Sequence, residues 1–137
     1  MVSTAIVYHP PTTGRWAALL AERLRADGNT ADLVPVRAAA SNDVVFYEAL
    51  VLLSPVLFGR MHGAALALDV CGTRPTAIVA VTEPGRAAQA PRLFRSTGRG
   101  RLAFFWLPPE GAFQDPALLR SVAEWVGRSG YRRRVGR

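Results

Sequence analysis

The chain has 137 residues, of which 50% are hydrophobic and 20% are charged, and its formal net charge at pH 7 is +7. Its length predicts one globular domain, because domains of about 100 to 150 residues are the most common, and its apolar content excludes a disordered chain. The longest apolar runs are much shorter than the ~20 residues that cross a bilayer, so no membrane span is expected. One cysteine and two histidines favour neither a disulfide framework nor a metal site.

The predicted elements alternate between strands and helices along the chain. Residues 3–8 predict a strand, and an amphipathic pattern predicts a helix that begins at Thr13 and ends near Gly28. A second strand at 33–36 is placed at a sheet edge, because Pro35 lacks a backbone N–H. The remaining predicted elements are a short helix at 43–48, a strand at 50–54, a helix at 60–71, a strand at 76–82, a helix bent at Pro91, a strand at 102–107 and a helix capped by Asp115.

Five apolar strands that alternate with helices predict a doubly wound α/β fold. We expect a five-stranded parallel sheet in the order 2-1-3-4-5, covered on both faces in a three-layer αβα arrangement. The aromatic residues at 104–106 and Trp125 are assigned to its core. Residues 1–127 are predicted to form this single domain, and residues 128–137 a basic, solvated tail. Ligands bind such sheets beyond the carboxyl ends of the strands, so functional residues are expected in the loops that follow them.

The first of these loops contains Thr12, Thr13, Gly14, Arg15 and Trp16. Unpaired N–H groups at the start of a helix bind anions, and the Thr hydroxyls with the Arg15 guanidinium could complete a site for one phosphate group. The same residues are equally consistent with an ordinary loop in which a Thr caps the helix. No GxGxxG or GxxxxGK[ST] motif follows the first strand, which argues against dinucleotide binding and against P-loop NTPase chemistry.

A longer motif lies at residues 47–59, whose sequence YEALVLLSPVLFG resembles the third-strand signature of the flavodoxin-like family. The resemblance implies a flavoprotein that binds FMN and carries out electron transfer or a small flavin-dependent oxidoreductase reaction. In the family, a first loop of the pattern [ST]-x-T-G-x-T wraps the FMN phosphate. Here Thr13 and Gly14 match the centre of that pattern, whereas Pro11 and Trp16 replace its outer hydroxyl residues.

The flavin ring is expected at the other two loops. The predicted cofactor-binding residues there are Ser54, Pro55, Val56, Leu57, Phe58 and Gly59 after the third strand, and Thr82, Glu83 and Gly85 after the fourth. Apolar side chains at the mouth of the sheet suit a planar ring, on which Phe58 could stack. Alternatively, Leu57 and Phe58 cover the core or the interface of a homodimer, and residues 84–85 are only a turn. No pair of residues stands out as a general acid and base, so no catalytic residue is assigned.

All 17 basic side chains are arginine, and the positive excess lies in residues 86–101 and 128–137. This charge predicts an anionic redox partner or a carboxylate-bearing substrate that docks on the 86–101 side, and a nucleic-acid-associated protein is a third, weaker interpretation that charge alone supports. A flavodoxin fold that has lost FMN and serves as a binding or assembly module through its Arg-rich surface is the alternative. No basic residue precedes Pro10, so no secretory signal is expected and a cytoplasmic location is predicted.

Overall fold

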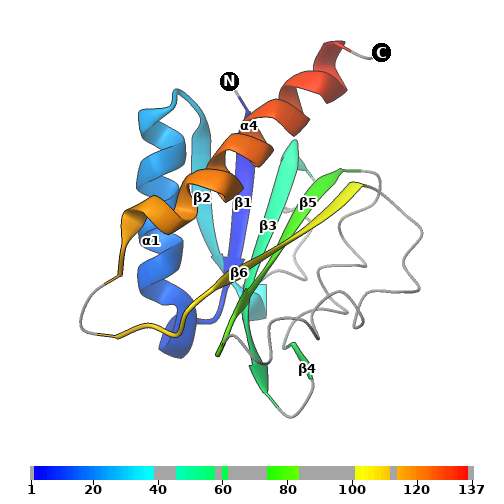
Figure 1. Cartoon of the computed structure of the whole chain (residues 1–137). Helices are drawn as coiled ribbons and strands as arrows, with labels where there is room; N and C mark the ends of the chain where they lie inside the picture. The colour runs from blue at the N-terminus through cyan, green and yellow to red at the C-terminus, as the bar shows by residue number, and fades with distance from the viewer. Residues whose placement is uncertain are drawn as a thin grey trace.

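The computed structural model describes residues 2–38, 46–57, 60–61, 74–83, 101–111 and 114–135. Parallel strands form its sheet in the order β2-β1-β3-β5-β6, which is the predicted doubly wound order (Figure 1). Their bounds are β1 Ser3–Tyr8, β2 Thr30–Pro35, β3 Ala49–Leu57, β5 Pro75–Val81 and β6 Arg101–Leu107. The edge position predicted for the Pro35 strand is confirmed. A short strand β4, Arg60–Met61, pairs antiparallel with the end of β3.

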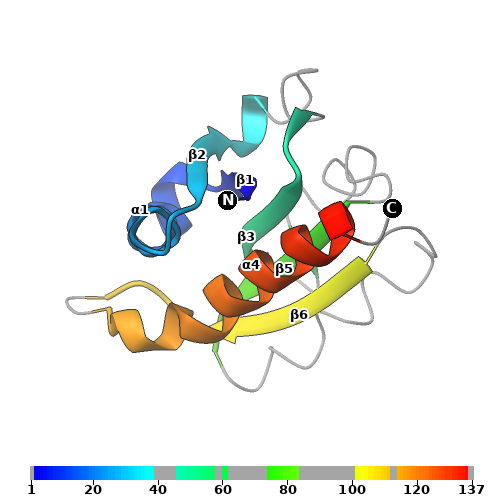
Figure 2. The ribbon, with the colours of Figure 1, turned by 90° about the horizontal axis from the view of Figure 1, so that it is seen from above.

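Two helices of the described chain, α1 (Pro10–Ala26) and α4 (Arg120–Val135), pack on the same face of this sheet (Figures 1 and 2). One core cluster joins Trp16 and Leu20 of α1 with Val126 of α4 and with alternate residues of the strands. The strand residues of this cluster include Ile6, Val51, Leu53, Ala77, Val79 and Leu107. Each fully buried aliphatic side chain contributes about 1.5 to 3 kcal/mol, so this layer fixes the position of α1 against β1 and β3.

Helix α1 begins at Pro10, directly after β1, and not at Thr13 as predicted. Prolines suit the first turn of a helix, where an N–H would have no carbonyl partner within the helix. The predicted end is confirmed: Gly28 has a φ of 88°, and the N–H of Asn29 reaches the Leu24 carbonyl at 2.9 Å. The segment predicted as a phosphate-binding loop is therefore largely the first turns of a helix.

Strand β3 continues through the predicted second loop as far as Leu57. Its pairing with β1 ends at Leu53, whereas its pairing with β5 continues to Pro55. Pro55 lies beyond the end of β1, so its missing N–H does not interrupt the pairing of β3 with β1. Residues 60–61 then pair back on β3 as β4, so the prediction of a helix from residue 60 is wrong at these two positions. The remainder of that predicted helix and the helix bent at Pro91 lie outside the described residues.

The C-terminal elements depart from prediction in two respects. Phe105 packs edge to face on Trp125 with ring centroids 6.3 Å apart, as a core assignment requires, but Phe104 and Trp106 are 36% and 40% exposed. Strand β6 is the last strand of the sheet, and alternation directs these two side chains away from the face that α4 covers. Asp115 caps the 3-10 turn η4 (Pro116–Leu119) through the Ala117 N–H, and helix α4 then continues to Val135. Residues 128–135 are thus helical backbone; a domain boundary at residue 127 stays a prediction.

Candidate functional site

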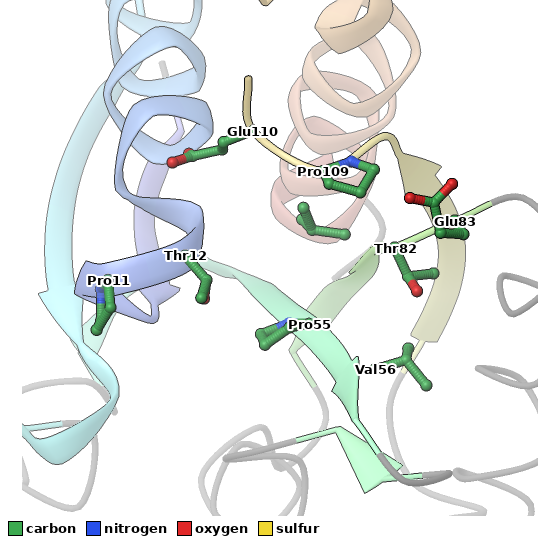
Figure 3. A pocket seen from close by; sticks show the side chains of 9 residues that line it. Pro11, Thr12, Pro55, Val56, Thr82, Glu83, Pro109 and Glu110 are labelled. Carbon is green, nitrogen blue, oxygen red and sulfur yellow. The ribbon is translucent and has the colours of Figure 1, made fainter. Parts of the chain in front are cut away.

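A cleft of about 330 Å³ opens at the carboxyl ends of the strands, where the strand order reverses between β1 and β3 (Figure 3). This is the position at which doubly wound sheets bind ligands, and the volume lies at the lower end of the range for small-molecule sites. The cleft has two walls, which come from different elements of the fold. The strand wall consists of Pro55, Val56, Val81, Thr82 and Glu83, and the helix wall of Pro11, Thr12, Pro109 and Glu110.

The strand wall combines three apolar residues with Thr82 and Glu83, and the Thr82 backbone is hydrogen-bonded to β6. Val56 and Val81 are 2% and 5% exposed, and they lie at the ends of β3 and β5. The Thr82 N–H donates to the Leu107 carbonyl at 3.0 Å, and the Thr82 carbonyl accepts the Trp106 indole N–H at 2.6 Å. Because these two main-chain groups are already paired, they are not available to a ligand, and the exposed polar group on this wall is the Glu83 side chain.

On the helix side, the predicted phosphate ligand Thr13 is fully buried next to the cleft. Its Oγ1 accepts the His9 N–H at 2.8 Å and lies 3.2 Å from the His9 carbonyl oxygen and 3.3 Å from that of Leu53. The hydroxyl proton can be donated to one of these oxygens at a time. Thr13 therefore joins the start of α1 to β1 and β3.

A second set of hydrogen bonds fixes the loop after β6 to α1. The indole N–H of Trp16 donates to the Pro108 carbonyl at 2.9 Å, and the Trp16 backbone N–H donates to Glu110 Oε2 at 2.8 Å. The Arg15 guanidinium donates to the Gly111 carbonyl at 2.8 Å. Figure 3 shows the Glu110 carboxylate extending toward α1 along the upper edge of the cleft. These contacts make Trp16 a core residue, 1% exposed, that also anchors the loop.

The charges on the described lining are all negative. Glu83 stands on the strand wall and Glu110 on the helix wall, and neither Arg nor His is among the residues that line the cleft in this part of the chain. A carboxylate within several ångströms opposes the binding of an anion and favours the binding of a neutral or cationic group. The site as described therefore suits an uncharged, largely apolar ligand.

The cleft brings together five residues of the predicted site, namely Thr12, Pro55, Val56, Thr82 and Glu83. It does not include Thr13, Gly14, Arg15, Trp16 or Ser54, of which Thr13, Trp16 and Ser54 are buried. Leu57 ends β3, whereas Phe58, Gly59 and Gly85 lie outside the described residues.

The sequence does not point to Pro109 and Glu110. The signal that could have found them is the stiff Pro108-Pro109 pair that follows the fifth predicted strand at the same carboxyl edge.

Two searches of the described residues give negative results. No three His, Cys, Asp or Glu side chains in this part of the chain lie close enough together to hold a metal ion. No helix within the described ranges has both the length and the apolar content needed to cross a membrane.

Comparison with known proteins locates the chain by its fold and not by its sequence. No family model matches the sequence, and no curated protein matches it significantly. Among solved structures, a short-chain flavodoxin associated with a PDU bacterial microcompartment has a TM-score of 0.71 and 13% identity, over 95% of this chain and 99% of that one. The two-electron reduced flavodoxin of Megasphaera elsdenii has a TM-score of 0.68 and 12% identity, over 91% of this chain and 98% of that one.

A third similar structure is much longer than this chain. The rubredoxin oxygen:oxidoreductase of Desulfovibrio gigas has a TM-score of 0.63 and 15% identity, over 94% of this chain but only 36% of that one. At this level of identity the three likenesses establish the fold. The chain has a flavodoxin-like α/β fold, and the resemblance predicted from residues 47–59 is confirmed at the level of the fold.

Proposed function

We propose that this protein is an electron-transfer protein that holds the isoalloxazine ring of a flavin in the cleft. The observation that carries the proposal is an apolar cleft at the switch point of a sheet whose fold is shared with flavodoxins. FMN is the flavin that the sequence resemblance implies. A bound flavin would supply the capacity to accept and release electrons, and the protein would supply binding, orientation and electrostatics.

The strand wall fits the ring of such a cofactor. Pro55, Val56 and Val81 give this wall apolar side chains that are almost buried, so a flat ring bound here would contact hydrocarbon over a small area. Pro109 presents a further apolar surface from the opposite side of the cleft. Glu83 is exposed beside this surface, and its negative charge would oppose the addition of an electron nearby.

The helix wall does not fit the phosphate of FMN. Pro10 and Pro11 occupy the first turn of α1 and have no N–H to donate. The Thr13 hydroxyl is buried and bonded within the protein, and the Trp16 amide already donates to a carboxylate. No contact to a phosphate is therefore assigned, and the proposal rests on the ring alone.

The partner is proposed to be anionic, since the chain carries a net charge of +7. The arginine-rich segment 86–101 lies outside the described residues apart from Arg101, so docking on that side stays a prediction, as do a homodimer and the cytoplasmic location. The poor fit of a phosphate is equally consistent with the alternative, a binding module that has lost FMN, and the position of the cleft at the switch point is the observation that favours a flavin ring.

The proposal is tested by titrating the protein into lumiflavin, which is the ring without ribityl chain or phosphate, and into riboflavin, while flavin fluorescence is followed. We expect quenching with a dissociation constant of tens of micromolar or lower, as for a weak small-molecule site. Thr12→Trp fills the cleft from an exposed position on α1 and should weaken binding by at least about tenfold, which corresponds to 1.4 kcal/mol.

Ala18→Trp is the matched control, because Ala18 is also exposed on α1 but does not line the cleft. It should leave flavin binding unchanged. Absence of quenching with the parent protein, or equal loss of binding in both variants, would reject this cleft as a flavin site.

A further inference from the structure

The helix wall carries one carboxylate, that of Glu110, which accepts a hydrogen bond from the backbone of α1. Trp16 stands at the last position of the pattern that, in the flavodoxin-like family, wraps a phosphate, and in this chain its backbone N–H donates to Glu110 Oε2 at 2.8 Å. A carboxylate of the protein thus binds a backbone amide of the segment that this pattern covers. Hydrogen bonds to an ionised acceptor are roughly twice as strong as neutral ones, so this occupant is not displaced without cost.

The position of Glu110 is fixed from both sides along the chain. Before it, the Pro108 carbonyl accepts the Trp16 indole N–H, and Pro109 restricts the backbone. After it, the Gly111 carbonyl accepts hydrogen bonds from Arg15 at 2.8 Å and from Gln114 at 3.0 Å. The carboxylate is held against α1 by its neighbours, and its contact with the Trp16 amide does not depend on a ligand.

The same geometry disfavours a phosphate ester in two further ways. A phosphate monoester carries a charge of about −1.5 to −2 at neutral pH, which would lie near the charge of Glu110 in a cleft whose described lining contains no cation. The Arg15 guanidinium, which is next to Trp16 in the sequence, donates to the Gly111 carbonyl. A neutral ribityl chain would not be repelled by the Glu110 carboxylate. It would also not depend on the Trp16 N–H, which that carboxylate already accepts.

We propose that Glu110 is a built-in occupant of the anion position, so that the cleft selects a flavin without a 5′-phosphate, such as riboflavin, over FMN. This inference rests on the proposed flavin site and adds the ligand class and the residue that sets it. Glu110 acts by occupying a donor and by its charge.

The test compares the dissociation constants of riboflavin and FMN, measured by calorimetry and by fluorescence, for the parent and for Glu110→Gln. The parent should bind riboflavin more tightly than FMN. Glu110→Gln keeps an oxygen that can accept the Trp16 N–H but removes the charge, so FMN binding should strengthen by about tenfold while riboflavin binding changes by less than about twofold. Glu124→Gln removes the same charge from an exposed site on α4 and should change neither constant.

A second measurement does not depend on flavin. In Glu110→Ala the Trp16 amide loses its acceptor, so its NMR resonance should respond to added inorganic phosphate, whereas the parent resonance should not. Urea unfolding of each variant establishes that it is folded.

The possible outcomes separate the two proposals. Tighter binding of FMN than of riboflavin by the parent, or an unchanged ratio in Glu110→Gln, overturns the role of Glu110 and leaves the flavin site intact. If lumiflavin, riboflavin and FMN all fail to bind the parent and the variants, the proposed function falls and this inference falls with it.

Discussion

The two walls of the cleft are built on opposite principles. On the strand wall, the apolar residues Pro55, Val56 and Val81 are almost buried, and the exposed carboxylate of Glu83 stands beside them. Behind the helix wall, the polar groups of Thr13 and Trp16 are bonded within the protein, through Thr13 to His9 and β3 and through Trp16 to the loop after β6. Uncovered apolar surface gains about 25 cal/mol for each Å² that a ligand covers, whereas a satisfied hydrogen bond gains little by exchange.

This difference separates the residues of the predicted site that form the scaffold from those that face the ligand. A residue whose functional group is already bonded inside the protein should affect stability when it is changed. A residue that only lines the opening should affect binding.

The largest effect is expected at Trp16, which is buried and bonded to the loop after β6. Trp16→Ala should lower the free energy of unfolding by about 3 to 5 kcal/mol, because it leaves a cavity between α1 and the sheet and removes a hydrogen bond to Pro108. Urea denaturation followed by the fluorescence of Trp106 and Trp125 measures this loss. A loss below about 1 kcal/mol with a selective loss of flavin would place Trp16 in the binding site and break the comparison.

Thr13→Val should come next. The variant keeps the shape of the side chain but leaves the His9 N–H without its acceptor, which costs about 1 to 3 kcal/mol of stability. Flavin affinity should stay within about twofold of the parent value, because the hydroxyl does not face the cleft. Thr12→Val is the control at an exposed position, with an expected change in stability of less than about 0.5 kcal/mol. If folded Thr13→Val bound flavin more weakly than the parent, the Thr13 hydroxyl would be a ligand-binding group.

The features of the fold that the sequence predicted correctly depend on local chemistry or on the alternation of elements. Gly28 ends α1 because glycine adopts a positive φ without strain, and Asp115 caps η4 because its side chain reaches the Ala117 N–H. The position of β2 follows from one missing N–H at Pro35. Each of these effects involves only a few neighbouring residues, so it can be predicted from the sequence alone.

The features that were missed depend on contacts between distant parts of the chain. The length of β3 is set by the point at which β1 ends and by the return of β4, neither of which leaves a mark on residues 54–57. The contact between Trp16 and Glu110 joins positions that are 94 residues apart. The matched Thr13-Gly14 pair correctly indicates the fold, but whether it binds a ligand depends on a loop that the motif does not contain.

At Gly14, a substitution is expected to increase the stability of the protein. A Cβ built at Gly14 would have its nearest neighbour at 3.9 Å, the Tyr8 Cε2 atom, which is an ordinary contact. Because the residue lies inside α1, Gly14→Ala should raise the free energy of unfolding by about 0.5 to 1 kcal/mol. Gly28→Ala is the matched control and should destabilise by about 1 kcal/mol, since its φ is 88°. If Gly14→Ala instead weakens flavin binding strongly, a ligand approaches the backbone at that point and the helix wall is part of the site.

The smallest expected effect is electrostatic and belongs to the strand wall. Glu83 is exposed at the cleft, so its carboxylate is well solvated and acts on a bound ring through water. Reduction brings negative charge to the ring, and the carboxylate opposes it. Glu83→Gln should therefore raise the midpoint potential of bound riboflavin, by about 30 mV for one electron at low ionic strength. The shift should shrink as salt is added, because a Debye length of about 10 Å at 0.1 M screens exposed charges.

Glu22→Gln, which removes a charge from an exposed position of α1 that does not line the cleft, is the control. It should leave the midpoint potential within about 5 mV of the parent value, because solvent and salt screen the charge of Glu22 from the ring. Equal shifts in both variants would mean that the ring responds to the overall charge of the protein and not to its neighbour on the strand wall. A downward shift in Glu83→Gln alone would mean that the carboxylate accepts a hydrogen bond from the reduced ring, which would make Glu83 a ligand of the cofactor.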